Sequence, residues 1–298
     1  MKERLVILDV MRGIGILLVV LGHLLSKDIS INNSLLISIT IFNFIYLFHM
    51  PLFVVVAGFL CKPFVVSGKA VVGKLRTLLG TYLLWHFGIG LFEGKISGLG
   101  SIVPFIIDSF LKPDSPWFLF ALFVCAFLLY IYIFLHRYLR FVAIVPVLGL
   151  LFVTKISYIN EYLPYMLIGY FVRLFMDRAD RSKKMYFEAI LVLGYILSRS
   201  YLSWVTILLI VATTYLSWLI LKSRWLTKCL SILGEQSLEI YLVSGLLLFI
   251  NIGSGLISTL LEMVVIMGSS LLMVSIVRMN NRVSLLVFGR RGVNQQTG

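Results

Sequence analysis

Three ionisable side chains lie inside the first membrane-length apolar stretch of the sequence, residues 6–25. They are Asp9, Arg12 and His23. A charged side chain at the centre of a bilayer costs about 2.5–3.5 kcal/mol on insertion scales, so such residues are rare unless they carry function. Aspartate and arginine can form an ion pair, and a neutral imidazole can act as a general base. The stretch is therefore the first candidate for a chemical site.

The spacing predicts that all three side chains share one face of a helix. Arg12 and His23 are eleven residues apart, which at ~100° per residue is three turns plus ~20°, and about 16 Å along the axis. Asp9 precedes Arg12 by three residues, within pairing distance. Such a stripe has to face a protein interior or a water-filled cavity. We predict catalytic roles for His23 and Arg12, with Asp9 orienting Arg12; a structural ion pair and a merely hydrogen-bonded histidine are the alternatives.

The second apolar stretch contains Phe48-His49-Met50-Pro51. Proline removes a backbone donor and can kink a helix, which frees a carbonyl group near the break. We expect freed carbonyls to fix the tautomer of His49. A proline-interrupted span beside a polar stripe is also where a substrate channel can be built. His49 is therefore a predicted substrate contact, and packing at a kink is the alternative.

Two further sets of residues are candidates for binding. Trp117 begins a later apolar stretch, and Asp114 lies just before it, so both are predicted to face the acceptor at the outer mouth of a pocket. An interfacial tryptophan without substrate contact is the alternative. Lys74 and Arg76 belong to a basic loop region that could receive a phosphorylated cofactor. The alternative for these residues is positive charge that only sets the membrane topology.

Composition places these residues in a polytopic membrane protein. The chain has 298 residues, of which 60% are hydrophobic and 13% charged, and its mean hydropathy is +1.02. No long polar stretch remains to build a soluble domain, so we expect one membrane domain over residues 1–298. The three cysteines have neither paired nor metal-like spacing, and no metal-ligand cluster is apparent.

Apolar runs predict an all-α bundle of about ten transmembrane helices. The connection between the third and fourth spans, with its Gly94–Gly100 and Lys112–Pro116 segments, is expected to be the longest loop. The ten predicted spans are residues 6–25, 38–60, 77–92, 117–135, 141–154, 158–175, 186–198, 201–220, 236–252 and 256–277.

The positive charges support this map and a cytoplasmic location for both termini. Of the 26 Lys and Arg residues, five fall on outer loops, Arg12 lies within a span, and the other twenty fall on inner loops. The net charge of +13 therefore reflects topology and contact with anionic lipid, and nucleic-acid binding is not expected.

Several of these motifs resemble the acyltransferase-3 family of integral membrane O-acyltransferases. The first span, residues 8–23, has the Arg, ten residues, then His signature in Arg12 and His23, and the second resembles the family's second helix around His49. Similar motifs recur in order: Trp117-Phe118-Leu119, Leu163-Pro164-Tyr165 with Gly169-Tyr170, and Ile232-Leu233-Gly234 with Ile240-Tyr241-Leu242. The nearest branch resembles fucose 4-O-acetylases and exopolysaccharide O-acetyltransferases. Ser244 stands where the family often places a histidine.

The resemblance implies an O-acetyltransferase with acetyl-CoA as donor and a sugar hydroxyl as acceptor, on a cell-surface or exported polysaccharide or its precursor. It also implies Arg12 and His23 as the essential pair, no bound cofactor or metal, and a place in the bacterial plasma membrane, possible partners being the polysaccharide biosynthesis machinery. A ten-helix small-molecule or glycan transporter and a non-catalytic accessory subunit are the rival functions. The absence of an evident internal repeat argues against the transporter.

Overall fold

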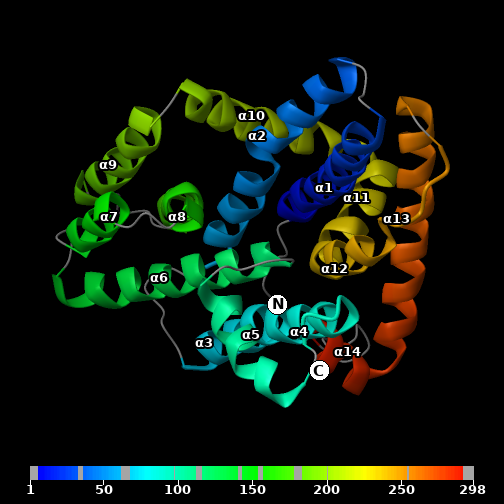
Figure 1. The fold of residues 1–298 in the computed structure, drawn as a ribbon. Coiled ribbons are helices and arrows are strands. Elements are labelled where there is room, and N and C mark those ends of the chain that lie inside the picture. The colour runs from blue at the N-terminus through cyan, green and yellow to red at the C-terminus, as the bar shows by residue number, and fades with distance from the viewer. Residues whose placement is uncertain are drawn as a thin grey trace. The chain divides into compact units, whose positions relative to one another are not determined.

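The computed structural model describes residues 6–32, 36–61, 68–96, 98–111, 116–139, 143–153, 157–177, 183–199, 201–253 and 255–290. Throughout these residues the regular structure is helical, with no strand, which confirms the all-α prediction (Figure 1). In chain order the elements are α1 (Val6–Asn32), α2 (Leu36–Phe59), α3 (Gly68–Lys74), the π-helical η1 (Leu75–Gly80), α4 (Thr81–Phe92), α5 (Leu99–Leu111), α6 (Trp117–Leu139), α7 (Ile144–Val153), α8 (Ser157–Asp177), α9 (Lys183–Arg199), α10 (Tyr201–Ile220), α11 (Arg224–Glu235), α12 (Ser237–Leu247), α13 (Leu256–Met279) and α14 (Asn281–Phe288).

Five of these helices are long and apolar enough to cross a membrane. The qualifying segments lie in α1, α2, α6, α10 and α13. Large apolar side chains on α10 and α13 are exposed, among them Leu208 at 66% and Val264 at 71%, as expected of surfaces that face lipid. The protein is therefore a helical membrane protein. The total of ten spans and the cytoplasmic side of both termini remain predictions.

Every predicted span overlaps a helix, but four helices were not predicted, the first of them α3 in the expected basic loop. The expected loop between the third and fourth spans contains α5, where glycines and Pro104 concealed an otherwise apolar helix. Helices α11 and α14 are short and carry charged as well as apolar residues. A search for continuous apolar runs misses such amphipathic helices, because their apolar residues occupy one face only.

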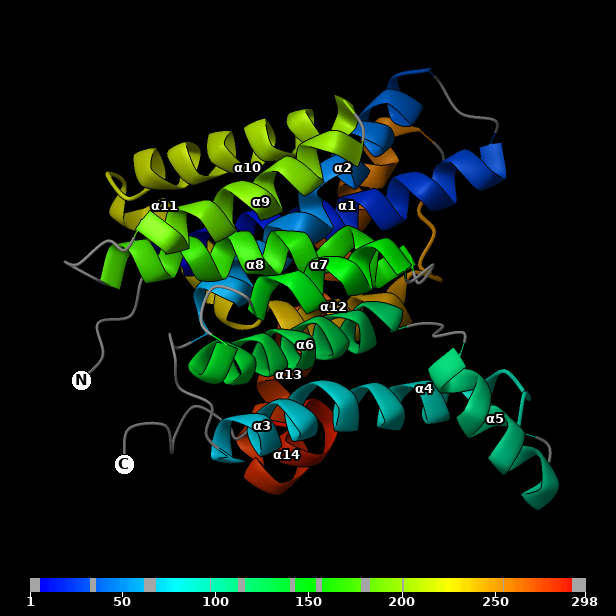
Figure 2. The same cartoon turned by 90° about the vertical axis from the view of Figure 1, so that its left-hand side faces the viewer.

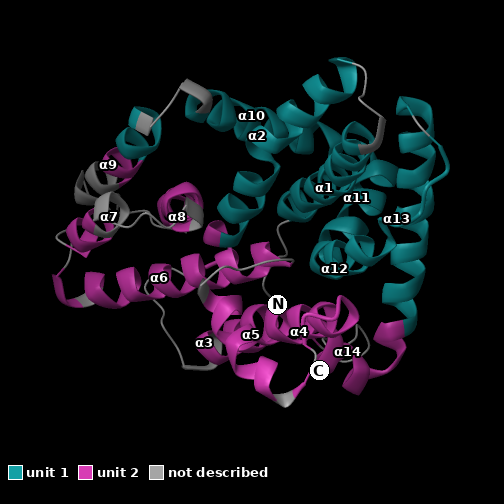
Figure 3. Ribbon diagram, in the orientation of Figure 1, with its two compact units in different colours: residues 1–57, 193–276 teal, residues 58–192, 277–298 magenta. Residues whose placement is uncertain are grey.

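The chain forms two compact units, which Figure 3 shows in different colours. Unit 1 comprises residues 1–57 and 193–276, and unit 2 comprises residues 58–192 and 277–298. The prediction of a single domain is not tested by this division, and each unit is described by itself below.

Unit 1 is built on very close packing between α1 and α11. A Cβ atom added at Gly13 would lie 2.1 Å from the Leu230 carbonyl oxygen, and one at Gly234 would lie 1.8 Å from that of Asp9. The two backbones are therefore in direct contact, which only residues without a side chain permit. Further along α1, Ile16, Val19, Val20 and Leu24 form a core with residues of α12 and α13; these are Ile240, Ile266 and Met267.

Unit 2 contains α6 packed against α8, and α4 linked to α5 and α14 (Figure 2). The Tyr82 hydroxyl donates to the Ser109 carbonyl at 2.7 Å, and Trp85 Nε1 donates to the Val287 carbonyl at 2.8 Å. Gly289 ends α14 with φ of 65° and approaches the backbone of Arg76 and Thr77. A β-carbon there would be both conformationally strained and obstructed.

The α1–α11 contact gives a direct stability prediction. Gly234→Ala is expected to lower the free energy of unfolding by roughly 1–3 kcal/mol, because the new methyl group collides with the Asp9 carbonyl. Thermal unfolding of purified protein in detergent measures the change. Gly268→Ala is the matched control, since nothing lies within 4 Å of its added Cβ in α13. Equal melting temperatures for the two variants would contradict the packing.

Candidate functional site

The predicted ion pair on α1 is present. The Arg12 guanidinium donates to Oδ1 of Asp9, three residues earlier on the same helix. Asp9 is buried, and the Arg12 side chain is 20% exposed. The Nε of Arg12 is also buried and has no hydrogen-bond partner among the described residues. The guanidinium thus keeps one N–H that the pair with Asp9 does not use.

Helix α11 positions this pair through the backbone. Gly234 lies against the carbonyl group of Asp9, and its added Cβ would also come within 3.0 Å of the Gly13 nitrogen. The segment of α1 from Asp9 to Gly13 therefore cannot rotate or slide without meeting α11. This packing fixes the face of α1 from which Arg12 leaves the backbone, and the pair with Asp9 holds its guanidinium.

His23 lies on the same helix, which is continuous from Val6 to Asn32. The Arg12–His23 separation along the axis is therefore the about 16 Å that eleven residues of helix give. Gly22 packs on α2, since its added Cβ would lie 3.1 Å from the Tyr46 ring and 3.3 Å from Ile45. The half-buried His23 thus sits where α1 meets the turn of α2 that precedes His49.

His49 is buried, at 2% exposure, and packs edge-on against Tyr46 at 4.8 Å between ring centroids. Its Nδ1 lies 2.7 Å from the Ile45 carbonyl oxygen. A carbonyl can only accept, so Nδ1 carries the proton and the neutral ring offers Nε2 as an acceptor. Tyr46, which contacts the His49 ring, also packs on Gly22, the neighbour of His23. Unit 1 therefore brings Asp9 to Arg12, and His23 to the neighbourhood of His49.

The carbonyl that Pro51 frees is not the one that orients His49, and that expectation was wrong. Pro51 cannot donate to the carbonyl four residues earlier, which is that of Leu47. Thr206 of α10 supplies the missing donor, with its Oγ1 3.0 Å from the Leu47 oxygen. Helix α2 runs through the proline without interruption. A hydroxyl from a neighbouring helix repairs the backbone, as membrane helices require.

The remaining candidates that the structure describes belong to unit 2. Trp117 is the first residue of α6, half-buried, and stacks on Tyr162 of α8 at 6.0 Å with 29° between the ring planes. Asp114 lies outside the described residues. Tyr162 was not predicted; its place one helix turn from the start of α8, in a segment rich in tyrosine, was the available signal.

Lys74 and Arg76 lie where α3 passes into the π-helical η1. Lys74 is half-buried and Arg76 is exposed. Burial raises the pKa of the Cys61 thiol, and the nearby Lys74 charge acts in the opposite direction. Thr77 Oγ1 donates to the Gly289 carbonyl at 3.2 Å, so the C-terminal turn supports this segment. Single π-helical turns inside helices are frequent at functional sites.

Two buried carboxylates were underestimated from the sequence. Glu239 is completely buried in the first turn of α12, and Glu262 is 4% exposed in α13. Glu262 pairs with Lys27 near the end of α1. Glu262 lies within a predicted span and Lys27 lies beside one. Charges of opposite sign at such positions were the signal from which this pair could have been predicted.

The geometry in unit 1 suits acyl or proton transfer. A neutral imidazole can accept a proton from a hydroxyl group or bond to an acyl group itself. A fixed guanidinium can stabilise negative charge on an oxygen.

Comparison with known proteins identifies the family. The acyltransferase domain of a known family matches residues 5–279. The nodulation protein NolL of Sinorhizobium fredii (strain NBRC 101917 / NGR234) is 37% identical over 87 residues, which are 28% of this chain and 24% of that protein. The match thus spans about a quarter of the length of that relative. No solved structure matches the chain. Because the acyltransferase domain matches the chain from α1 through α13, the chain belongs to the acyltransferase-3 family.

Proposed function

We propose that the protein is an O-acetyltransferase that moves an acetyl group from acetyl-CoA to a sugar hydroxyl of a cell-surface or exported polysaccharide or its precursor. The plasma membrane of a bacterium is the proposed location. One observation carries the proposal: a carboxylate-paired guanidinium and an imidazole share a single membrane-length helix in a chain of the acyltransferase family. Charged and ionisable side chains are rare inside a bilayer unless they carry a function.

His23 is the proposed catalytic residue. In one route its neutral imidazole takes the proton of the sugar hydroxyl while that oxygen attacks the thioester carbonyl. The C–S bond then breaks, and the departing CoA sulfur ends as a thiol by taking that proton. In the other route His23 first accepts the acetyl group, releases CoA, and then passes the acetyl group to the hydroxyl oxygen. Both routes place the reacting carbonyl at His23.

Arg12 and Asp9 serve the donor in this proposal. The guanidinium binds the polar acyl-pantetheine arm or stabilises charge on its carbonyl oxygen, and Asp9 holds the guanidinium in place. An extended pantetheine arm can cover the about 16 Å between Arg12 and His23. Lys74 and Arg76 are proposed to bind the CoA phosphates from the cytoplasmic side.

His49 and Trp117 are the proposed acceptor contacts. The Nε2 of His49 can accept a hydrogen bond from a sugar hydroxyl, and the indole of Trp117 offers an apolar face to a sugar ring. Asp114 is kept as a proposed contact from the sequence alone. A partnership with polysaccharide biosynthesis proteins also remains a proposal.

Replacing His23 is the primary test. His23→Ala is expected to lower acetyl transfer at least 100-fold, because it removes the general base or acyl acceptor. Release of CoA from radiolabelled acetyl-CoA is measured with purified protein in detergent, with a cell-envelope glycan extract as acceptor. His136→Ala, at the far end of α6, is the matched control. Full transfer by His23→Ala would exclude both routes, and glycan flux without CoA release would favour a transporter.

The Arg12–Asp9 pair gives a graded prediction. Arg12→Lys keeps the charge but loses the planar fork, and we expect a roughly 10- to 100-fold lower kcat/KM. Asp9→Asn retains an acceptor oxygen for the guanidinium, so its loss is expected to be smaller. The comparison uses initial rates at varied acetyl-CoA concentration. An Asp9→Asn variant less active than Arg12→Lys would reverse the assigned order of importance.

The basic segment predicts a specific effect on donor binding. Lys74→Gln and Arg76→Gln are each expected to raise the KM for acetyl-CoA by roughly tenfold with kcat unchanged, because one charged phosphate contact contributes about 1.5–3 kcal/mol at most. The effect should shrink as ionic strength rises. Lys228→Gln, an exposed lysine of α11, serves as control. An unchanged KM in both variants would remove these residues from the donor site.

A further inference from the structure

The end of α1 beyond His23 carries two charged residues, Lys27 and Asp28, and both contact the connection between α12 and α13. Lys27 follows His23 by four residues, so the two lie on the same face of α1, one turn apart. The described part of this connection nearest to Lys27 is residues 248–253, which we name the α12–α13 strap. All contacts of the strap discussed below lie within unit 1.

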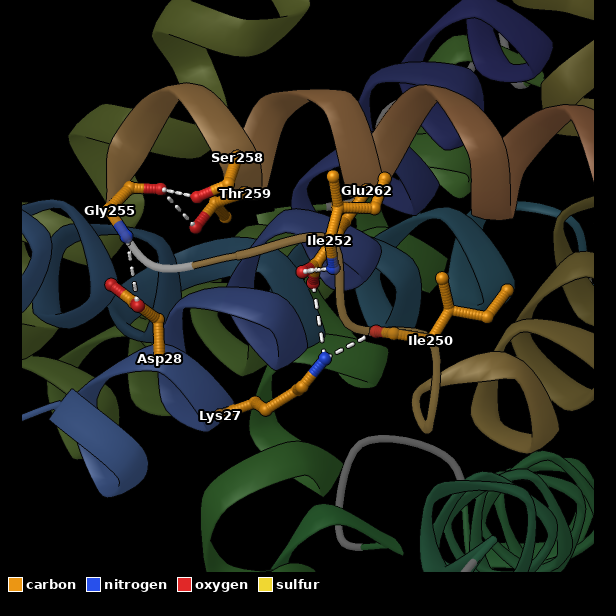
Figure 4. A network of polar contacts seen from close by, with 8 residues as sticks. All are labelled: Lys27, Asp28, Ile250, Ile252, Gly255, Ser258, Thr259 and Glu262. Carbon is orange, nitrogen blue, oxygen red and sulfur yellow. Dashed lines mark hydrogen bonds and ion pairs between the residues drawn. The ribbon is translucent and has the colours of Figure 1, made fainter.

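Lys27 joins the strap to α13. Its Nζ lies 3.2 Å from Oε2 of Glu262 and also donates to the backbone carbonyl of Ile250 (Figure 4). The Glu262 side chain is only 5% exposed, and that of Lys27 is 21% exposed. A pair so sheltered is screened little by solvent, and removing either partner leaves a charge buried without compensation.

Glu262 binds the strap with its other oxygen. Its Oε1 accepts from the backbone N–H of Ile252 at 2.8 Å, and Oδ1 of Asp28 accepts from the N–H of Gly255 at 3.3 Å (Figure 4). Irregular backbone near a membrane needs such partners, because its polar groups cannot be left unpaired. One ion pair thus supplies partners for two backbone groups of the strap, the Ile250 carbonyl and the Ile252 N–H, and ties both to α1.

The strap also packs on an apolar core to which the residues around His23 contribute. Leu248 and Ile250 pack against the core to which Val19, Val20 and Leu24 contribute from α1. Of these, Val20 lies three residues before His23 and Leu24 lies one residue after it. Polar contacts at Lys27 and apolar contacts with this core therefore hold the same segment against α1.

We propose that Lys27 and Glu262 are positioning residues that hold the α12–α13 strap over the His23 turn and keep water from the acyl donor there. The inference rests on the proposed function, since it assumes a thioester at His23. Neither residue is proposed to touch the substrate. Their role is to decide which nucleophile reaches the acyl group.

Loosening the strap should change the product rather than simply slow the reaction. In the intended reaction a sugar hydroxyl oxygen bonds to the acyl carbon, the C–S bond breaks, and CoA leaves as the thiol. If water enters, its oxygen bonds to the same carbon and the products are acetate and CoA thiol. Exclusion of water from an active site suppresses this kind of side reaction. The ratio of acetate to acetylated glycan therefore reports how well the strap excludes water.

The test measures this ratio for variants that remove different parts of the network. Lys27→Met removes the pair and the bond to Ile250, and Glu262→Leu removes the pair and the bond to Ile252. Each is expected to raise the acetate-to-glycan ratio roughly tenfold or more. Glu262→Gln keeps an oxygen that can accept from Ile252, so its ratio is expected to stay closer to that of the wild type. Unfolding of part of the sample lowers both products together and leaves the ratio unchanged.

Exchanging the two charges tests whether water is excluded by the bonds to the strap or by the ion pair itself. Lys27→Glu combined with Glu262→Lys restores opposite charges, but the new Glu cannot donate to Ile250 and the new Lys cannot accept from Ile252. We expect the ratio to stay high in this double variant. Lys95→Met is the matched control, because Lys95 also pairs with a carboxylate, Glu93 at 2.7 Å, but both side chains are nearly half exposed.

The outcomes distinguish the inference from the function on which it rests. A wild-type protein with no His23-dependent acetyl transfer would refute the proposed function. If the wild-type protein transfers acetyl groups but Lys27→Met and Glu262→Leu keep the wild-type ratio, the proposed role of the strap is refuted and the proposed function is not. A charge-exchanged variant with the wild-type ratio would also refute that role, because the pair would then act without its bonds to the strap.

Discussion

The site in unit 1 depends on the backbone contact between α1 and α11. An ion pair within a membrane-length helix has to be sheltered from lipid, and a neighbouring helix can shelter it closely only where no side chain intervenes. Gly13 and Gly234 provide that condition, and each lies against a carbonyl group of the other helix. The contact fixes α1 in rotation as well as in translation. The orientation of Asp9 and Arg12 on α1 follows from it.

Helix α1 then acts as a rigid spacer between two chemically different ends. Near its start, Asp9 and Arg12 are held by α11; near its end, Lys27 and Asp28 are held by the connection to α13. His23 lies between these anchors, closer to the second. Because a straight helix fixes its own length, the separation of the guanidinium and the imidazole does not depend on loop conformation. A long, thin substrate such as an acyl-pantetheine arm suits this arrangement.

Polar groups in the membrane-facing helices are satisfied by partners far away in the sequence. Thr206 of α10 bonds to the Leu47 carbonyl that Pro51 leaves without its helical donor, so α2 retains its helical path. His49, two residues after Leu47, instead bonds to the carbonyl of Ile45 in its own helix. The carbonyl that the proline frees is therefore satisfied by a residue of α10, whereas the histidine tautomer is set within α2.

The sequence by itself determined the membrane class, the helical segments with continuous apolar runs, and the Asp9–Arg12 pair. These depend on local composition and on the fixed period of the helix, which act within a few residues. Only the tertiary structure decided the rest. Helices α5 and α11 are stabilised by contacts with α4 and α1 that local hydropathy does not encode. Glu262 and Lys27 are 235 positions apart in the chain. Buried charges need partners of opposite sign, and no local pattern specifies which two residues will meet.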